Sequence, residues 1–210
     1  MKSVKWESVE ASSDGDYPKV EPGAYVGVIT GMEDNEAREY VTCLFDIAEG
    51  PLKGHFSDRF FSDKPWAHSM TLSYKDSVLG MLKQRLETIQ ACNPGFDPFA
   101  AWDAGRLDMF NGRKVGLVMR EEEYFDKRTE TFKMGSPRCF RFCRLDQLED
   151  ERNANPKPKE LDDDQKVAAL VRTGYGTMEA KDMVAAMAKG EDFSDVPFMP
   201  SDGGSVFSAK

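Results

Sequence analysis

The order of hydrophobic patterns between residues 22 and 149 limits the folds open to this chain more than any other feature. Residues 22–32 (PGAYVGVITGM) begin with a Pro-Gly turn signal and continue as a β-rich segment, which predicts a first strand. Residues 39–50 place apolar side chains at every second position from Val41 to Ile47, the period of a strand with one buried face. After a turn, residues 55–62 (HFSDRFFS) are expected to form a third strand, antiparallel to the second.

The periodicity changes after this third predicted strand. From Asp76 to Ile89, apolar residues recur every three to four positions, so residues 76–92 predict an amphipathic helix that ends before Asn93-Pro94-Gly95. A short helical turn is expected within residues 103–109. Residues 112–125 and 138–148 then predict strands four and five, which a charged hairpin loop joins.

Three strands, a helix and two further strands are the element order of the OB-fold. This mainly β (α+β) fold is a five-stranded, partly open barrel, and the sequence places the helix between strands three and four. Gly27, Gly31 and Gly116 lie inside predicted strands and favour a barrel, because sharply coiled strands need such positions. A generic α+β sheet with the same element order is the alternative.

The composition along the chain predicts five segments. Residues 1–21 are expected to be a flexible leader, and residues 22–150 the OB-fold domain that binds nucleic acid. Residues 151–164 are rich in proline and charge and predict a linker. Residues 165–190 predict a small helical appendage of two short helices, and residues 191–210 an acidic flexible tail.

Targeting signals and disulfide patterns are absent from the sequence. No run of about 18 apolar residues is present, and the N-terminal residues lack the apolar core of a secretory signal. The four cysteines show no spacing typical of a disulfide scaffold, so we expect free thiols. These features predict a cytoplasmic protein.

The common catalytic and metal-binding signatures are also absent from the sequence. No phosphate-binding loop, dinucleotide fingerprint, zinc-protease motif or nucleophile elbow occurs, and His55 and His68 are isolated from other catalytic residue types. Cys139 and Cys143 would stand roughly 13 Å apart on a regular strand, too far to share one metal ion. We therefore predict a protein that is not an enzyme and that has no metal site and no cofactor.

Charge is segregated along the chain although its net value is −9. Residues 1–50 contain 4 basic and 11 acidic residues, whereas residues 110–145 contain 9 basic and 5 acidic residues. Basic residues interleaved with aromatic ones suit an unpaired nucleic acid strand, because cations contact phosphates and rings stack on bases. The candidate nucleic-acid-binding residues are Arg59, Phe61, Trp66, Tyr74, Arg113, Lys114, Arg120, Tyr124, Lys127, Arg128, Phe132, Lys133, Arg138 and Arg141.

Some of these candidates have a predicted place in the barrel. Lys127, Arg128, Phe132 and Lys133 fall in the loop between strands four and five, which borders the binding groove of an OB-fold. Arg59 and Phe61 share one face of the predicted third strand and are expected on the groove floor, with Trp66 and Tyr74 on the loop beyond. The alternative is that the aromatic residues belong to the core and the charges are merely solvated.

Four segments carry a resemblance to a known group of proteins. Residues 45–56 (FDIAEGPLKGHF), 73–77 (SYKDS), 93–97 (NPGFD) and 112–124 (GRKVGLVMREEEY) are similar to OB-fold proteins from phages and integrated elements of Gram-positive bacteria. The resemblance extends over residues 22–149. It implies binding of single-stranded DNA during replication or recombination.

The tail carries a second resemblance. In residues 191–198 (EDFSDVPF), the last four residues resemble the acidic hook with which bacterial single-stranded DNA-binding proteins dock replication and repair partners. Here 12 residues follow Phe198, whereas the hook of that family uses the terminal carboxylate. The candidate partner-docking residues are Asp192, Phe193, Asp195, Val196, Pro197 and Phe198.

Together these patterns predict a non-enzymatic single-stranded DNA-binding protein of phage or mobile-element replication and recombination. Its tail is expected to recruit replication or recombination proteins, and the sequence leaves homo-oligomerisation open. Two alternatives stand beside this prediction. The barrel is a protein-interaction module, such as a phage protein that binds a host factor, or it binds RNA, since stacking alone does not distinguish the sugar.

Overall fold

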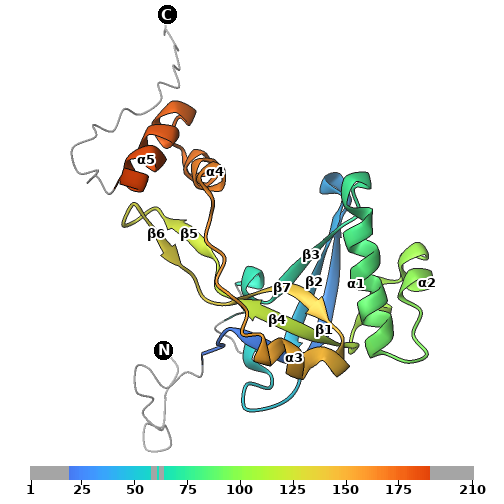
Figure 1. The fold of residues 1–210 in the computed structure, drawn as a ribbon. Helices are drawn as coiled ribbons and strands as arrows, with labels where there is room; N and C mark the ends of the chain where they lie inside the picture. The colour runs from blue at the N-terminus through green and yellow to red at the C-terminus, as the bar shows by residue number, and fades with distance from the viewer. Residues whose placement is uncertain (1–18, 58–60, 62–63, 190–210) are drawn as a thin grey trace, which may run out of the picture. The chain divides into compact units, whose positions relative to one another are not determined.

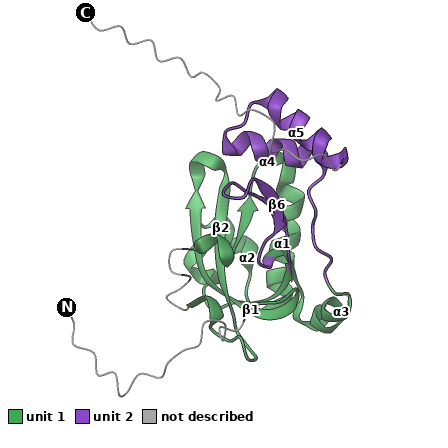
Figure 2. Cartoon of the chain, turned by 90° about the vertical axis from the view of Figure 1, so that its left-hand side faces the viewer, with its two compact units in different colours: residues 1–119, 139–155 green, residues 120–138, 156–210 purple. Residues whose placement is uncertain are grey.

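The computed structural model describes residues 19–57, 61 and 64–189. The fold is mixed α+β, and the chain divides into two compact units (Figure 2). Unit 1 consists of residues 1–119 and 139–155, and unit 2 of residues 120–138 and 156–210.

Unit 1 is built on a five-stranded, antiparallel, barrel-like sheet (Figure 1). Its strands are β1 (Gly23–Asn35), β2 (Tyr40–Ile47), β3 (Ser69–Ser73), β4 (Lys114–Arg120) and β7 (Arg138–Cys143). They follow the order β3-β2-β1-β4-β7. The long strand β1 pairs with both β2 and β4, and its register against β2 shifts between Ile29 and Gly31. Such a bulge increases local twist, which helps the sheet to curl.

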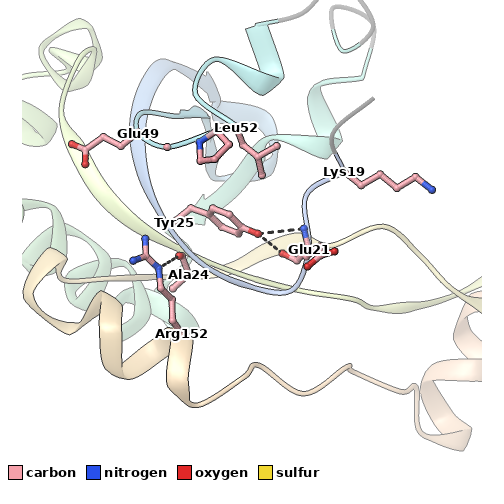
Figure 3. A pocket seen from close by; sticks show the side chains of 9 residues that line it. Lys19, Glu21, Ala24, Tyr25, Glu49, Leu52 and Arg152 are labelled. Carbon is pink, nitrogen blue, oxygen red and sulfur yellow. Dashed lines mark hydrogen bonds between the residues drawn. The ribbon is translucent and has the colours of Figure 1, made fainter. Parts of the chain in front are cut away.

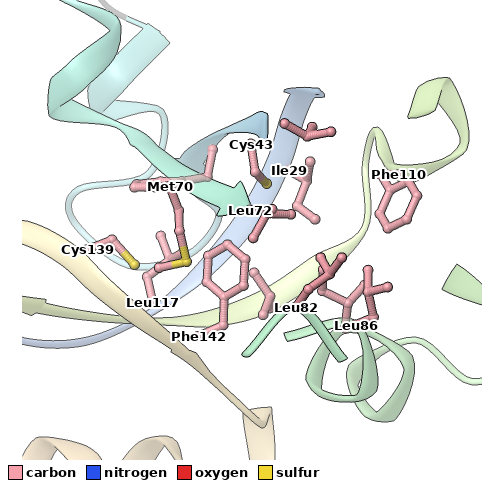
Figure 4. Close-up of a cluster of buried hydrophobic side chains, with 14 of the residues drawn as sticks. Ile29, Cys43, Met70, Leu72, Leu82, Leu86, Phe110, Leu117, Cys139 and Phe142 are labelled. Atoms are coloured by element: carbon pink, nitrogen blue, oxygen red, sulfur yellow. The ribbon is translucent and has the colours of Figure 1, made fainter. Parts of the chain in front are cut away.

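The predicted alternation of β2 is confirmed by its burial. Val41, Cys43, Phe45 and Ile47 all lie in the main core. Helix α1 (Leu79–Cys92) follows β3 and packs Leu82, Leu86 and Ile89 against the same core (Figure 4). The 3₁₀ turn η6 (Asp76–Val78) precedes it, so the helical region matches the predicted residues 76–92.

The remaining helical elements of unit 1 are short. They are η2 (Glu36–Arg38), η3 (His55–Ser57), η5 (Pro65–Ala67), α2 (Pro98–Asp103), η7 (Leu107–Phe110), η8 (Leu145–Gln147) and α3 (Leu148–Asn153). Helix α2 begins where the Asp97 side chain accepts hydrogen bonds from the backbone N–H groups of Phe99 and Ala100. In the part of the chain that the structure describes, no helix is long and apolar enough to cross a bilayer.

Unit 2 has a small core of its own. Strands β5 (Glu123–Asp126) and β6 (Thr131–Met134) form a hairpin, and helices α4 (Asp163–Thr173) and α5 (Thr177–Lys189) follow in the chain. Asp162 and Gln165 form a capping box at the start of α4, and Gly174 ends it with a φ of 111°. The core residues are Phe125, Leu170, Ala180, Met183 and Val184.

The third strand lies elsewhere than predicted. Residues 55–57 form η3 because the buried carboxylate of Asp46 accepts hydrogen bonds from the backbone N–H of Phe56 and the hydroxyl of Ser57. The third strand is instead β3, where Met70 and Leu72 point inward and polar residues alternate with them. Residues 58–60 and 62, also part of the predicted strand, lie outside the described residues.

Further boundaries differ from the prediction. The predicted strand at residues 112–125 is two strands, β4 and β5, and the predicted charged loop contains β6. This hairpin groups with the C-terminal helices, whereas we expected it inside a domain of residues 22–150. The first residues of the predicted linker belong to α3, and the helical turn expected at residues 103–109 is divided between α2 and η7.

Candidate nucleic-acid interface

The structure distributes the candidate residues over both units. The candidates in unit 2 are Arg120, Tyr124, Lys127, Arg128, Phe132, Lys133 and Arg138. The described candidates in unit 1 are Phe61, Trp66, Tyr74, Arg113, Lys114 and Arg141. Arg59 and the tail residues Asp192, Phe193, Asp195, Val196, Pro197 and Phe198 lie outside the described residues.

The β5–β6 hairpin brings several candidates onto one face. Tyr124 stands opposite Lys133 in the antiparallel register, and Asp126 stands opposite Thr131. Because side chains alternate across a strand, these four residues share the outer face of the hairpin. We call this surface the hairpin face. Tyr124 has 47% of its area exposed, which makes its ring accessible to a ligand.

Phe132 lies on the opposite side of the hairpin from Tyr124. It pairs with Phe125, with ring centroids 5.1 Å apart, and packs against the core of unit 2. The ammonium of Lys166 on α4 lies 5.5 Å from the Phe132 centroid. We expected Phe132 to stack on a base; in the structure it is partly buried and packs against the core of unit 2.

The turn of the hairpin is held by Asp126. Its carboxylate accepts hydrogen bonds from the Lys133 ammonium at 2.8 Å, the Arg128 backbone N–H at 3.0 Å and the Thr129 hydroxyl at 3.0 Å. These bonds, with that from Lys133 the largest effect, lower the pKa of Asp126 to about 2. Lys133 therefore has a structural partner in addition to any ligand that it contacts.

Charges elsewhere in the same segment are mostly paired. Arg120 binds Glu122 at 2.9 Å, and Glu123 lies 3.7 Å from the Lys166 ammonium. The Lys127 ammonium donates to the Thr173 carbonyl at the end of α4, 3.1 Å away. The exposed side chains of Arg128 and Arg138 form no ion pair with any residue that the structure describes. These two arginines are the cations best placed to contact a phosphate.

Three basic candidates of unit 1 and Phe61 make contacts within the fold. The guanidinium of Arg113 lies 4.2 Å above the ring centre of Phe96 and donates to the Met109 carbonyl. Lys114 pairs with Glu49 at 2.7 Å, and Arg141 pairs with Glu151. The Phe61 ring packs against His55 and Phe56, with centroids 4.8 and 5.2 Å away. These contacts favour a structural role for the four candidates.

Tyr74 stands in acidic surroundings. Its hydroxyl donates to Asp34 at 3.1 Å, and its ring makes an edge contact with Trp102 at 6.2 Å. Desolvation, the hydrogen bond to Asp34 and the negative charges of Glu36 and Glu39 raise the pKa of Tyr74. The acidic tip, which we define as Glu33, Asp34, Glu36 and Glu39 at the β1–β2 turn, disfavours phosphate there. Trp66 on η5 is 54% exposed and remains a stacking candidate in unit 1.

The cysteines are placed as structural residues. All four cysteines are free, and burial raises the pKa of Cys43 to about 12 and that of Cys143 to about 11. Cys139 lies in the main core, whereas Cys143 packs with Ala24, Val118 and Leu148. Among the described residues, no three His, Cys, Asp or Glu side chains are grouped to hold a metal ion.

Unit 1 contains a cavity that the sequence did not predict. It has a volume of about 390 Å³, and its wall includes Tyr25, Leu52, Lys19 and Arg152 (Figure 3). Arg152 donates to the Ala24 carbonyl at 2.8 Å, and the Tyr25 hydroxyl donates to the Glu21 carbonyl at 2.8 Å. None of the predicted site residues lines it, and no periodicity or motif marks these distant residues as neighbours.

The candidate residues that remain exposed and available to a ligand are therefore those of the hairpin face, Arg128, Arg138 and Trp66. Comparisons with known proteins assign none of them a role. No protein-family model matches the chain, and no curated protein is significantly similar to it.

Proposed function

We propose that this chain is a non-enzymatic OB-fold protein that binds single-stranded DNA in phage or mobile-element replication or recombination. The observation that carries the proposal is the strand order β3-β2-β1-β4-β7, with α1 between β3 and β4. In an OB-fold the strands have the same order, and the barrel closes where the third strand meets the fifth. The helix of an OB-fold also lies between the third and fourth strands in the chain. Binding of unpaired strands is a common use of this fold.

The β5–β6 hairpin is the proposed contact with DNA. It connects β4 to β7, the fourth and fifth strands of the sheet, and the corresponding loop borders the binding groove in OB-folds. The hairpin face supplies an exposed aromatic ring, and Arg128 and Arg138 supply cations near the turn and the start of β7. Phosphates bind the cations, while an unpaired base stacks on the ring.

The partners and location follow the same proposal. The tail residues 191–198 are proposed to dock replication or recombination proteins, since Phe193, Pro197 and Phe198 with acidic neighbours suit an apolar pocket with a basic rim. We place the protein in the cytoplasm, where such DNA transactions occur in bacteria. The acidic tip favours a second candidate function, a module that binds a basic protein partner.

A DNA titration separates these two functions. Labelled oligo-dT and a duplex of equal length are titrated at low and moderate salt, and anisotropy is measured. We expect tighter binding of the single strand, with an affinity that falls as salt rises, because each phosphate contact releases counterions. Absence of binding to either DNA at low salt would reject the proposed function.

Paired variants test the proposed contact. Arg128→Ala with Arg138→Ala is expected to flatten the slope of log affinity against log salt by about 0.7 per lost phosphate contact. Arg172→Ala with Lys181→Ala removes the same charge from exposed positions on α4 and α5 of the same unit. Equal flattening in both pairs would place the DNA outside the hairpin.

A further inference from the structure

The ring of Tyr124 lies against a glycine of the neighbouring strand. The N–H of Gly135 donates to the Glu122 carbonyl at 3.0 Å, which extends the hairpin ladder and sets Gly135 diagonally opposite Tyr124. A Cβ atom on Gly135 would stand 3.3 Å from Cδ1 and 3.5 Å from Cε1 of Tyr124. A side chain at position 135 would therefore crowd the edge of the ring and also the Glu122 carbonyl oxygen, which lies 3.3 Å from the same Cβ position.

This contact leaves Tyr124 supported on one side and accessible on another. Lys133 stands directly opposite in the register, and its ammonium is held by Asp126 at 2.8 Å. Nearly half of the Tyr124 area, 47%, remains exposed even though its strand neighbour Phe125 is buried. An exposed aromatic ring held at a fixed angle loses little freedom when a planar ligand stacks on it.

We propose that Tyr124 is a stacking platform for one unpaired base and that Gly135 is its positioning residue. The inference rests on the proposed binding of single-stranded DNA and assigns to this tyrosine the preference for single over double strands. Bases within a duplex are stacked on each other and paired, so their faces are not available to a side chain. Every base has such a face, and the platform therefore accepts any sequence.

Stabilisation of the hairpin is the competing explanation for the same contact. An aromatic ring across a glycine of a neighbouring strand covers exposed backbone and strengthens a sheet without binding any ligand. The two explanations differ in what leucine does at position 124. Leucine covers the glycine with apolar atoms but has no aromatic face, so it supports the hairpin and fails as a platform.

The experiment compares Tyr124→Phe, Tyr124→Trp and Tyr124→Leu in the full chain. We expect Phe and Trp to retain oligo-dT affinity, and Leu to weaken it roughly 5- to 150-fold, the range for loss of one stacked base. Duplex affinity should change less than twofold in all three. Met134→Ala is the matched control, because Met134 is 41% exposed on the same hairpin but on its other side. It should leave both affinities unchanged.

A spectroscopic readout reports stacking directly. An oligonucleotide that contains one 2-aminopurine should lose fluorescence on binding to the wild type, and regain it with Tyr124→Leu. Gly135→Ala should weaken oligo-dT binding modestly, because the new methyl group would push the ring edge aside by a few tenths of an ångström. Thermal melting of each variant checks that unit 2 is folded.

The outcomes separate the inference from the proposed function. If the wild type binds no oligo-dT, both fail together. If the wild type binds and Tyr124→Leu binds equally well, the platform is rejected and the function stands. A Tyr124→Leu variant that keeps both its affinity and its melting temperature would assign the ring to hairpin stability alone, a role that leucine also fills.

Discussion

At position 116 strand β4 passes so close to the end of β7 that no side chain fits. A Cβ atom there would stand 2.4 Å from the Sγ of Cys143 and 2.7 Å from its carbonyl oxygen. The second contact is with backbone, which cannot move without breaking the sheet. Glycine at this position was expected to mark a point where the strand coils, and the structure gives it a definite steric cause.

Gly116→Ala is therefore expected to destabilise unit 1. Overpacking of a tight site costs about 1–3 kcal/mol, so the urea midpoint should fall accordingly. Gly31→Ala is the matched control in the same sheet, because its nearest neighbour would be Leu44 Cδ1 at 3.4 Å, an ordinary contact. The control should change the free energy of unfolding by no more than about 0.5 kcal/mol. Equal losses in both variants would exclude the steric explanation.

Single residues were predicted well where one physical requirement decided their position. The alternation from Val41 to Ile47 has one explanation, a half-buried strand, and all four apolar side chains are buried. An aromatic residue beside a cation fits either of two roles, because its ring can stack on a ligand or fill a core. Tyr124 and Phe132 illustrate this ambiguity, since their register in the hairpin decides which is exposed, and the register depends on where the turn lies.

At the scale of elements, the misplaced third strand shows the limit of local patterns. Residues 55–62 contain three phenylalanines and read as a strand, but the buried carboxylate of Asp46 holds residues 55–57 in a turn. The true strand, SMTLS, has only two inward residues and gives a weak signal. Long-range hydrogen bonds from one polar side chain therefore overrode local propensity.

The hairpin and the two C-terminal helices share one core, although the sequence was read as placing them in different domains. Phe125 comes from β5, whereas Leu170, Ala180 and Met183 come from α4 and α5, more than 40 residues later. The helices were predicted from their own periodicity. Their partner was not, because periodicity shows that a face is apolar without showing what covers it.

Leu170→Ala should therefore loosen unit 2 in particular. Leu170 is fully buried in the core of that unit, and a Leu→Ala change at such a site costs about 2–5 kcal/mol. Hydrogen exchange is expected to speed up at the β5–β6 amides and to change little at the β1–β2 amides. Val171→Ala, at the next position of α4 with 39% of the side chain exposed, should leave both sets unchanged. Faster exchange in both sheets would show that the two units unfold together.

At the scale of the whole molecule, the chain has a net charge of −9 but contains a basic segment at residues 110–145. The sequence predicted this segregation, and the structure refines it. Much of the basic segment is neutralised locally, through pairs such as Lys133 with Asp126 and Arg141 with Glu151, and the acidic tip gathers four carboxylates at one turn. Counting charges along the chain could locate the segment but not the few cations that remain unpaired.

On the proposed function, the acidic tip should slow the approach of DNA to the chain. In an OB-fold the loop between strands one and two borders the binding groove. Glu36→Lys with Glu39→Lys is therefore expected to raise the on-rate for oligo-dT severalfold at 20 mM salt, because electrostatic steering acts over about a Debye length.

Stopped-flow anisotropy measures this rate, and the gain should nearly vanish at 0.5 M salt, where screening shortens that length to a few ångströms. Glu149→Lys with Asp150→Lys makes the same charge change at exposed positions of α3 and serves as the control. Equal acceleration by both pairs would mean that DNA responds to overall charge alone. A larger effect of the tip pair would locate the DNA path beside the β1–β2 turn.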